Sequence, residues 1–289
     1  MKFNIATAFA DIEHLCSIAE TAEECGYDGV AVSDHVVHPE NIRSPYPYTP
    51  DGQPRWQPSA PWADPIVAIA AMAASTERIR FVTSVFVLPM RNPFLVAKAV
   101  GTAQVLSQGR VILGIGMGWM KDEFELLGQN FHDRGRRADE MVEVLRTLWS
   151  EGMVEYHGEF YDFERLAMTP APRTRVPIFV GGFSAPALRR VARLADGWIS
   201  DSHSEKEITE IVGRIATLRR EAGREGLPFE VFGACTDIGD LDGYRRLEDA
   251  GITHMTAMPW LKAGSPDPPL EEKCDALRRF ADEFVSKLA

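Results

Sequence analysis

The feature of this sequence that most restricts its fold is a repeated alternation of short apolar runs with segments of helical periodicity. Eight such runs have the length of buried strands, and they lie at residues 3–6, 29–33, 79–84, 111–115, 177–180, 197–200, 229–233 and 252–257. Most of the segments between them place apolar residues on one helical face. Eight strands, each followed by a helix, predict an α/β protein with a closed (β/α)8 barrel, the TIM barrel.

Residues that begin helices support this alternation independently. Asp64 before Pro65 and Asn92 before Pro93 each combine an N-cap side chain with a first-turn proline. Ser204 followed by Glu207 has the spacing of a capping box, at the start of a segment with an apolar stripe. We therefore expect helices at about 65–74, from 93 to near 109, and from 205 onward.

An open, doubly wound sheet is the alternative arrangement of the same elements. A dinucleotide-binding fold of that kind places a glycine-rich turn after its first strand. Residues 6–10 follow the first apolar run here and contain no glycine. The barrel is therefore favoured, and since 289 residues are a usual length for one barrel, a single domain over residues 1–289 is expected.

Two insertions interrupt the alternation, at about 38–62 after the second strand and at about 120–175 after the fourth. The first is rich in proline and contains four large aromatic residues, which favours an ordered lid on the substrate side over a linker; these are Tyr46, Tyr48, Trp56 and Trp62. The second contains a helix around residues 138–149 and then a short β excursion at about 153–168. Both insertions follow strands at the end where barrel enzymes carry their sites.

Composition excludes several classes of function. The formal net charge of −11 disfavours nucleic acid and anionic membrane surfaces as partners. No apolar stretch approaches the length of a membrane span or a signal peptide, so a cytoplasmic protein is expected. The four cysteines and seven histidines show no metal-ligand spacing, so no metal site is expected, and a serine-hydrolase elbow is absent from the sequence.

Asp34 and His35 directly follow the second predicted strand. In a barrel this position faces the active site. An acid beside an imidazole suits hydrogen bonding to a heterocycle and proton transfer near neutral pH. The alternative is structural, with Asp34 capping a turn and His35 packing nearby.

Two glycine-rich segments follow later strands. Gly114, Gly116 and Gly118 resemble a phosphate loop only weakly, and they either let a flat ring approach the strand ends or allow close packing. We favour the first use. Gly181 and Gly182 precede a helix that begins near Ser184, and the free N–H groups of a helix N-terminus favour an anion such as phosphate.

Taken together, these residues and their order resemble the bacterial luciferase-like flavin and deazaflavin oxidoreductases. The resemblance covers nearly the whole chain, through the segments AEECGYDGVAVSDHV, ASTERIRFVTSVFVLPMRNPFLVAKAVGTAQVLSQGRVILGIGMGWMKDEFELLG, RGRRADEMVEVLRTLW, HGEFYDF and PIFVGGFSAPALRRVARLADGW. The most similar group is the one assigned to coenzyme F420, a 5-deazaflavin that carries hydride. FMN is the alternative cofactor.

The resemblance also implies roles for individual residues. It places Asp34 near the cofactor ring and His35 toward the reacting site, and it implies that both are catalytic residues. It implies a non-proline cis peptide bond between Ser84 and Val85 that supports the ring. It further implies a loop beside the ring and a phosphate segment, formed respectively by Gly114, Gly116 and Gly118 and by Gly181, Gly182 and Ser184.

One residue departs from the family pattern. Where the sugar-phosphate dehydrogenases of the family carry a glutamate acid, this chain has Trp119, and an indole cannot deliver that proton. Four further aromatic residues are expected around the mouth of the barrel, namely Tyr46, Tyr48, Trp56 and Trp62. A small apolar or aromatic substrate is therefore favoured over a sugar phosphate.

Three functions follow from these observations. The first is hydride transfer between F420 and a small organic substrate, with His35 exchanging the paired proton. The alternatives are an FMN-dependent monooxygenase that uses oxygen and a non-catalytic flavin or deazaflavin carrier on the same scaffold.

The helices at 65–74 and 93–106 carry apolar or small residues on more than one face, so a two-fold symmetric homodimer through them is expected.

Overall fold

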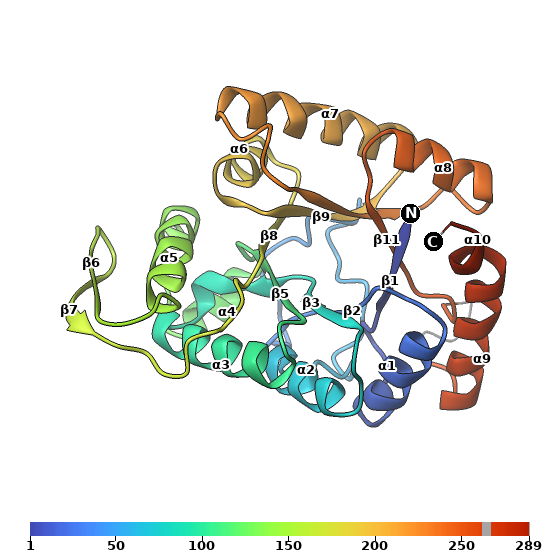
Figure 1. Ribbon diagram of the computed structural model, residues 1–289, viewed down its shortest axis with the longest axis horizontal. Helices are drawn as coiled ribbons and strands as arrows, with labels where there is room; N and C mark the ends of the chain where they lie inside the picture. The colour runs from blue at the N-terminus through green and yellow to red at the C-terminus, as the bar shows by residue number, and fades with distance from the viewer. Residues whose placement is uncertain (262–266, 289) are drawn as a thin grey trace.

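The computed structural model, which describes residues 1–261 and 267–288, contains a closed ring of eight parallel strands (Figure 1). In their order around the ring the strands are β1 (Lys2–Ala6), β2 (Gly29–Val32), β3 (Arg80–Thr83), β5 (Val111–Gly116), β8 (Ile178–Gly181), β9 (Gly197–His203), β10 (Glu230–Cys235) and β11 (His254–Ala257). Parallel pairing of β11 with β1 closes the ring. Each predicted apolar run overlaps one of these strands, and the predicted (β/α)8 barrel is confirmed.

Helices surround the barrel (Figure 1), with bounds α1 (Leu15–Glu24), α2 (Pro65–Ala74), α3 (Pro93–Leu106), α5 (Arg134–Leu148), α6 (Ala185–Leu194), α7 (Glu205–Glu221), α8 (Leu241–Asp249) and α9 (Leu270–Phe280). A 3-10 turn (Ile12–His14) precedes α1, and a π turn (Ala281–Val285) and α10 (Ser286–Leu288) follow α9. The predicted caps are confirmed. Asp64 accepts hydrogen bonds at the start of α2, Asn92 does so at the start of α3, and Ser204 with Glu207 forms the capping box of α7.

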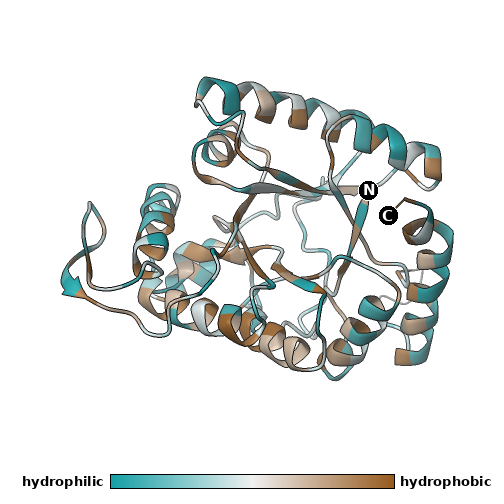
Figure 2. Cartoon of the chain, viewed as in Figure 1, coloured by the Kyte–Doolittle hydropathy of each residue, from teal (hydrophilic) through white to brown (hydrophobic). Residues whose placement is uncertain are grey.

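The apolar residues form two layers. A large cluster fills the space between the strands and the surrounding helices, where most helices turn their apolar side inward (Figure 2). A smaller cluster fills the inside of the barrel and consists of Ala31, Val82, Ile112, Phe179, Ile199 and Phe232, with Val85 packed against it. Because the barrel interior is packed with side chains, any ligand site must lie at one of its two ends.

A network of charged side chains closes the N-terminal end of the strands. Arg80 contacts the carboxylates of Asp28 at 2.5 Å and Glu230 at 2.9 Å, and His254 Nε2 lies 3.2 Å from Asp28. Burial alone would raise the pKa of the Asp28 carboxyl, but His254, Lys2 and Arg80 hold it well below its usual value. The charged side chains at this end are thus paired with one another. A ligand site is therefore expected at the opposite, carboxyl end of the strands.

Several elements lie outside the βα alternation. The short strand β4 (Phe86–Val87) pairs with β5 and continues into a 3-10 turn (Leu88–Met90). The second insertion contains the short helix α4 (Lys121–Leu126), which the sequence did not predict, and a hairpin of β6 (Val154–His157) and β7 (Asp162–Leu166), which confirms the predicted β excursion. The hairpin projects beside α5 (Figure 1).

None of the helices that the structure describes has both the length and the apolarity of a membrane span.

Candidate active site at the carboxyl end of the barrel

Asp34 lies just past β2 and is bound on both carboxylate oxygens. Arg91 donates to Oδ2 and Oδ1 at 2.7 Å each, and the Val87 N–H donates to Oδ2 at 2.9 Å. The Asp34 side chain has no exposed surface. Burial raises the pKa of this carboxyl, and Arg91 and the Val87 N–H act in the opposite direction. The structure thus places Asp34 where it fixes the chain after β3 rather than where it faces the opening.

The peptide bond between Ser84 and Val85 is cis, as the resemblance implied. It lies between β3 and β4, and the half-buried Val85 side chain covers the apolar cluster inside the barrel. A Cβ atom at Gly116 would come within 2.5 Å of Val85, and one at Gly181 within 2.8 Å. Glycines on β5 and β8 therefore leave room for Val85. Its side chain gives the rim of the barrel an apolar surface at this point.

The remaining glycines of this region also serve close packing. A Cβ at Gly114 would lie 2.0 Å from the Thr83 carbonyl oxygen, and one at Gly118 would lie 2.6 Å from Phe124. Backbone and side chains already occupy the space beside both residues. Of the two uses considered for this glycine run, the structure therefore shows the packing use directly at Gly114 and Gly118.

His35 is held by Glu123, an acid that the sequence did not predict as part of the site. Its Nδ1 lies 2.9 Å from Oε2 of Glu123 on α4, and Oε1 of the same carboxylate accepts the N–H groups of Val36 at 2.8 Å and Val37 at 3.2 Å. The Glu123 side chain is 2% exposed and that of His35 is 11% exposed. Burial raises the pKa of Glu123, but the hydrogen bonds from His35 and the two amides outweigh it, so the pKa lies below its usual value.

Aromatic side chains surround the other side of the His35 ring. The ring centroids of Trp56, Trp62 and Trp119 lie 4.8, 4.9 and 6.0 Å from that of His35. Tyr46 lies 5.2 Å from Trp56 and 5.0 Å from Trp119, again between centroids. The predicted gathering of aromatic residues at the mouth is therefore present, and it encloses His35 directly.

Most of these aromatic residues belong to residues 38–62, which we call the strap. At one side, Arg43 donates to Asp122 of α4 at 2.6 Å and to Glu125 at 2.5 Å. At the other side, Arg55 lies 3.3 Å from Asp201 on β9. The strap therefore crosses the mouth of the barrel between two ion pairs, one with α4 and one with β9.

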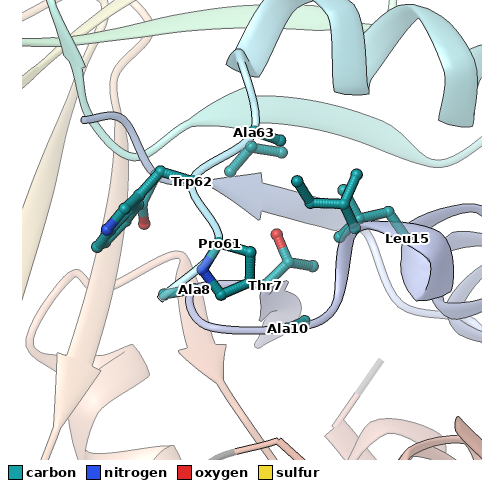
Figure 3. A pocket seen from close by; sticks show the side chains of 10 residues that line it. Thr7, Ala8, Ala10, Leu15, Pro61, Trp62 and Ala63 are labelled. Atoms are coloured by element: carbon teal, nitrogen blue, oxygen red, sulfur yellow. The ribbon is translucent and has the colours of Figure 1, made fainter. Parts of the chain in front are cut away.

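A small cavity lies where the end of the strap meets the loop after β1. Its lining includes Thr7, Ala8, Ala10, Leu15, Pro61, Trp62 and Ala63 (Figure 3). Its volume of about 10 Å³ is near the space that one water molecule needs. This cavity therefore has no room for a cofactor ring.

The predicted anion site lies at the start of α6. Ser184 Oγ accepts the Ala187 N–H at 3.4 Å as the N-cap, and Pro186 occupies the first turn. Gly182 has φ of +101°, a conformation that favours glycine. Within the described part of the chain, the N–H groups of residues 183–185 donate to no other group. Free N–H groups of this kind are usual at a helix N-terminus, and the binding of an anion here stays a prediction.

Comparison with known proteins identifies the family. Residues 3–236 match the sequence model of a family described as luciferase-like monooxygenase. The chain belongs to this luciferase-like family. The resemblance seen in the sequence is thereby confirmed, and so is the expectation of an oxidoreductase enzyme.

Relatives of this luciferase-like protein extend over its whole length. An uncharacterized protein of Mycobacterium tuberculosis is 38% identical over 291 residues, which cover 100% of both chains. A protein of Nakamurella multipartita named F420-dependent glucose-6-phosphate dehydrogenase is 29% identical over 278 residues, 93% of this chain and 75% of its own. Among solved structures, an F420-dependent secondary alcohol dehydrogenase in complex with an F420-acetone adduct has a TM-score of 0.75 at 17% identity, covering 99% of each chain, and supports the fold.

The structure of this luciferase-like chain brings most of the predicted site residues to one rim. Val85 lies beside Gly116 and Gly181. The ring centroid of Tyr48 in the strap lies 6.0 Å from that of Phe183, which precedes α6. His35 faces the tryptophans of the strap. The sequence did not predict that Arg91 pairs with Asp34 or that Glu123 pairs with His35. The one signal for Glu123 was its place in the DEFELL segment after the fourth barrel strand.

Proposed function

We propose that this luciferase-like protein is an F420-dependent oxidoreductase that acts on a small uncharged substrate. The observation that carries the proposal is the position of His35, which is bound through Nδ1 to Glu123 and is enclosed by three tryptophans at the barrel mouth. When bound, F420 would supply hydride chemistry through its deazaflavin ring. The names of two relatives, F420-dependent glucose-6-phosphate dehydrogenases, support this choice of cofactor.

The residues at the rim fit such a cofactor. Val85 offers an apolar surface to a flat ring, and the turn from Gly182 to Ala185 offers N–H groups to a phosphate. Buried polar atoms also lack partners in the described structure, among them Trp62 Nε1 and His203 Nε2. Buried donors and acceptors of this kind are stabilised when a polar ligand reaches them.

His35 would exchange the proton that accompanies hydride transfer. Its Nε2 has no hydrogen-bond partner among the described residues, whereas Nδ1 is taken by Glu123. The imidazole can therefore give a proton to a substrate oxygen, or accept one from it, through Nε2. Asp34 would act by holding Arg91 and the Val87 N–H, which fixes the segment that carries Val85.

The surrounding side chains favour an apolar or aromatic substrate. Trp119 stands 6.0 Å from His35 between ring centroids, and Trp56 and Tyr46 lie beside it. These rings would bury apolar surface and offer few charged partners to a sugar phosphate. The strap that carries Trp56 and Tyr46 would also keep water from the reacting atoms.

Titration of the purified protein with F420 and, separately, with FMN tests this proposal, with cofactor fluorescence as the readout. We expect F420 to bind and FMN to bind at least tenfold more weakly. Tight binding of FMN alone, with oxygen consumption when FMN is reduced, would instead support the monooxygenase. F420 binding without turnover of any member of a broad panel of alcohols, carbonyls and aromatic compounds would support the non-catalytic carrier.

Replacement of Gly182 by valine is expected to weaken F420 binding by at least tenfold, about 1.4 kcal/mol. The residue has φ of +101°, and its Cβ would lie 3.3 Å from that of Ala187, so the turn that would hold the phosphate must change shape. Affinity is measured by fluorescence titration. Gly152→Val is the matched control, because Gly152 also has a positive φ, of +83°, and has no atom within 4 Å of its Cβ position. Equal F420 affinity in wild type and G182V would remove the phosphate assignment.

We also propose a homodimer through α2 and α3. These two adjacent helices carry apolar residues outward as well as inward (Figure 2), and Val67 is 69% exposed and Leu95 72% exposed. Exposed apolar surface of this kind is typical of an interface. We expect a dimer mass at micromolar concentration by light scattering and a monomer for Leu95→Glu. Leu227→Glu, at another exposed leucine, should leave the mass unchanged; a wild-type monomer would contradict the proposal.

A further inference from the structure

We propose that Glu123 is a positioning residue that fixes His35 in the tautomer with a proton on Nδ1 and a free Nε2. The inference rests on the proposed function, in which His35 exchanges a proton with the substrate. Glu123 lies on α4, a helix for which the sequence predicted no site residue. Through Glu123, this helix would determine which nitrogen of the imidazole carries the proton. Neither the cofactor nor the substrate needs to be bound for this role.

The hydrogen bonds of Glu123 define the orientation of the ring. Oε2 faces His35 Nδ1 at 2.9 Å, while Oε1 accepts the N–H groups of Val36 and Val37. The carboxylate thus binds the side chain of His35 and the backbone of the two residues that follow it. This arrangement holds the imidazole at Nδ1 and fixes the backbone next to it, and none of the described residues forms a hydrogen bond to Nε2.

The ionisation of Glu123 determines which nitrogen carries the proton. The N–H groups of Val36 and Val37 both donate to Oε1 of this nearly buried carboxylate and favour its charged form whatever the tautomer of His35, and the pKa of Glu123 lies below its usual value. An ionised carboxylate can only accept hydrogen bonds. The proton in the His35 to Glu123 contact therefore belongs to Nδ1, and Nε2 keeps its lone pair.

The same carboxylate stabilises the imidazolium that forms when His35 takes a proton from the substrate through Nε2. The proton moves from the substrate oxygen to Nε2, and the positive charge that results lies beside the negative charge of Glu123. The other charged groups near this pair are already matched, because Asp34 binds Arg91 and Asp122 binds Arg43. Asp34 also feels the charge of His35, but it is paired with Arg91, so Glu123 is the carboxylate in direct contact with the imidazole.

Asp122 offers a matched control on the same helical turn. Its carboxylate accepts Arg43 Nε at 2.6 Å and lies 3.4 Å from Ser44 Oγ, so it holds the strap and does not contact His35. Both side chains are nearly buried. A substitution of Asp122 therefore changes the charge and packing of α4 without removing the partner of the imidazole.

Glu123→Gln is the decisive variant because it keeps the shape of the side chain. A glutamine can still accept the two backbone N–H groups through its oxygen, but its amide donates to Nδ1. We expect His35 to change to the tautomer with the proton on Nε2, seen by ¹⁵N chemical shifts of histidine-labelled protein without cofactor. We expect Asp122→Asn to leave the tautomer of His35 unchanged.

In the cofactor-bound enzyme, Glu123→Gln should lower kcat by about 10–100-fold with KM nearly constant. Loss of the carboxylate that orients a functional histidine has an effect of this size in metal sites. Glu123→Asp, which restores the charge, should recover part of that loss. A wild-type tautomer in E123Q would overturn the inference, and so would a tautomer change without loss of kcat if His35→Ala lowers turnover. If His35→Ala leaves turnover intact while E123Q still changes the tautomer, the proposed catalytic role of His35 fails and the positioning by Glu123 stands.

Discussion

Turnover by His35→Ala is expected to fall by about 10²–10⁴ relative to wild type, the usual contribution of a positioned acid or base. Affinity for the cofactor should change little, because Val85, where the ring is proposed to bind, and the proposed phosphate turn at Gly182 follow other strands than His35 does. The measurement combines steady-state turnover on a substrate found by screening with a fluorescence titration of the cofactor. It separates a chemical role for His35 from a packing role.

A packing role would give the reverse pattern. Removal of a ring that contacts Trp56, Trp62 and Trp119 would then lower stability and cofactor affinity, with little effect on the chemical step. His132→Ala, at an exposed histidine whose ring lies beside that of Phe131, controls for general effects of losing an imidazole. If His35→Ala binds cofactor and turns over at the wild-type rate, His35 is not the proton partner, and His203 or an ordered water takes its place as the candidate.

Asp34→Ala is expected to lower the free energy of unfolding by about 3 kcal/mol, within the range for breaking a buried ion pair from one side. The substitution leaves the Arg91 guanidinium without its two carboxylate contacts and leaves the Val87 N–H without its acceptor. Chemical denaturation with urea measures the loss. Cofactor affinity should fall as well, because Val85 and β4 lose the contact that holds them against β2.

The double variant Asp34→Leu with Arg91→Met separates the electrostatic cost from the loss of packing. Replacement of both partners by apolar side chains removes the uncompensated charge, so the double variant should be more stable than Asp34→Ala. If Asp34→Ala has wild-type stability and instead loses only turnover, Asp34 acts directly in catalysis, as the sequence alone suggested, and the positioning role is wrong.

The barrel could be predicted from the sequence because each of its signals is local. An N-cap such as Asp64 or Asn92 acts on the helix that it begins, and a buried parallel strand shows itself as a short apolar run. Helix α4 has neither signal. Its N-cap residue, Met120, makes no side-chain cap, and its first turn carries two acids that are usually exposed on a helix surface.

The site could be predicted in part, for a similar reason. His35 was identified by its place after a barrel strand, a rule that needs no knowledge of its neighbours. Its partner Glu123 lies 88 residues away along the chain, and Arg91 lies 57 residues from Asp34. Contacts over such separations depend on how the loops pack, so the pairing of a histidine with one acid among 42 acidic residues required the structure. The glycine run illustrates the same limit, since only the structure shows Thr83 and Phe124 beside it.

The strap has a consequence for how proteins of this architecture diverge. One uninterrupted stretch between β2 and α2 supplies Tyr46, Trp56 and Trp62 to the mouth, yet contributes no strand to the barrel. Mutations there alter the shape offered to a substrate without disturbing the pairing that stabilises the fold. Selection can therefore exchange this stretch as a module. Chimeras that carry the equivalent stretch of another family member offer a direct route to new substrate preferences on an unchanged barrel.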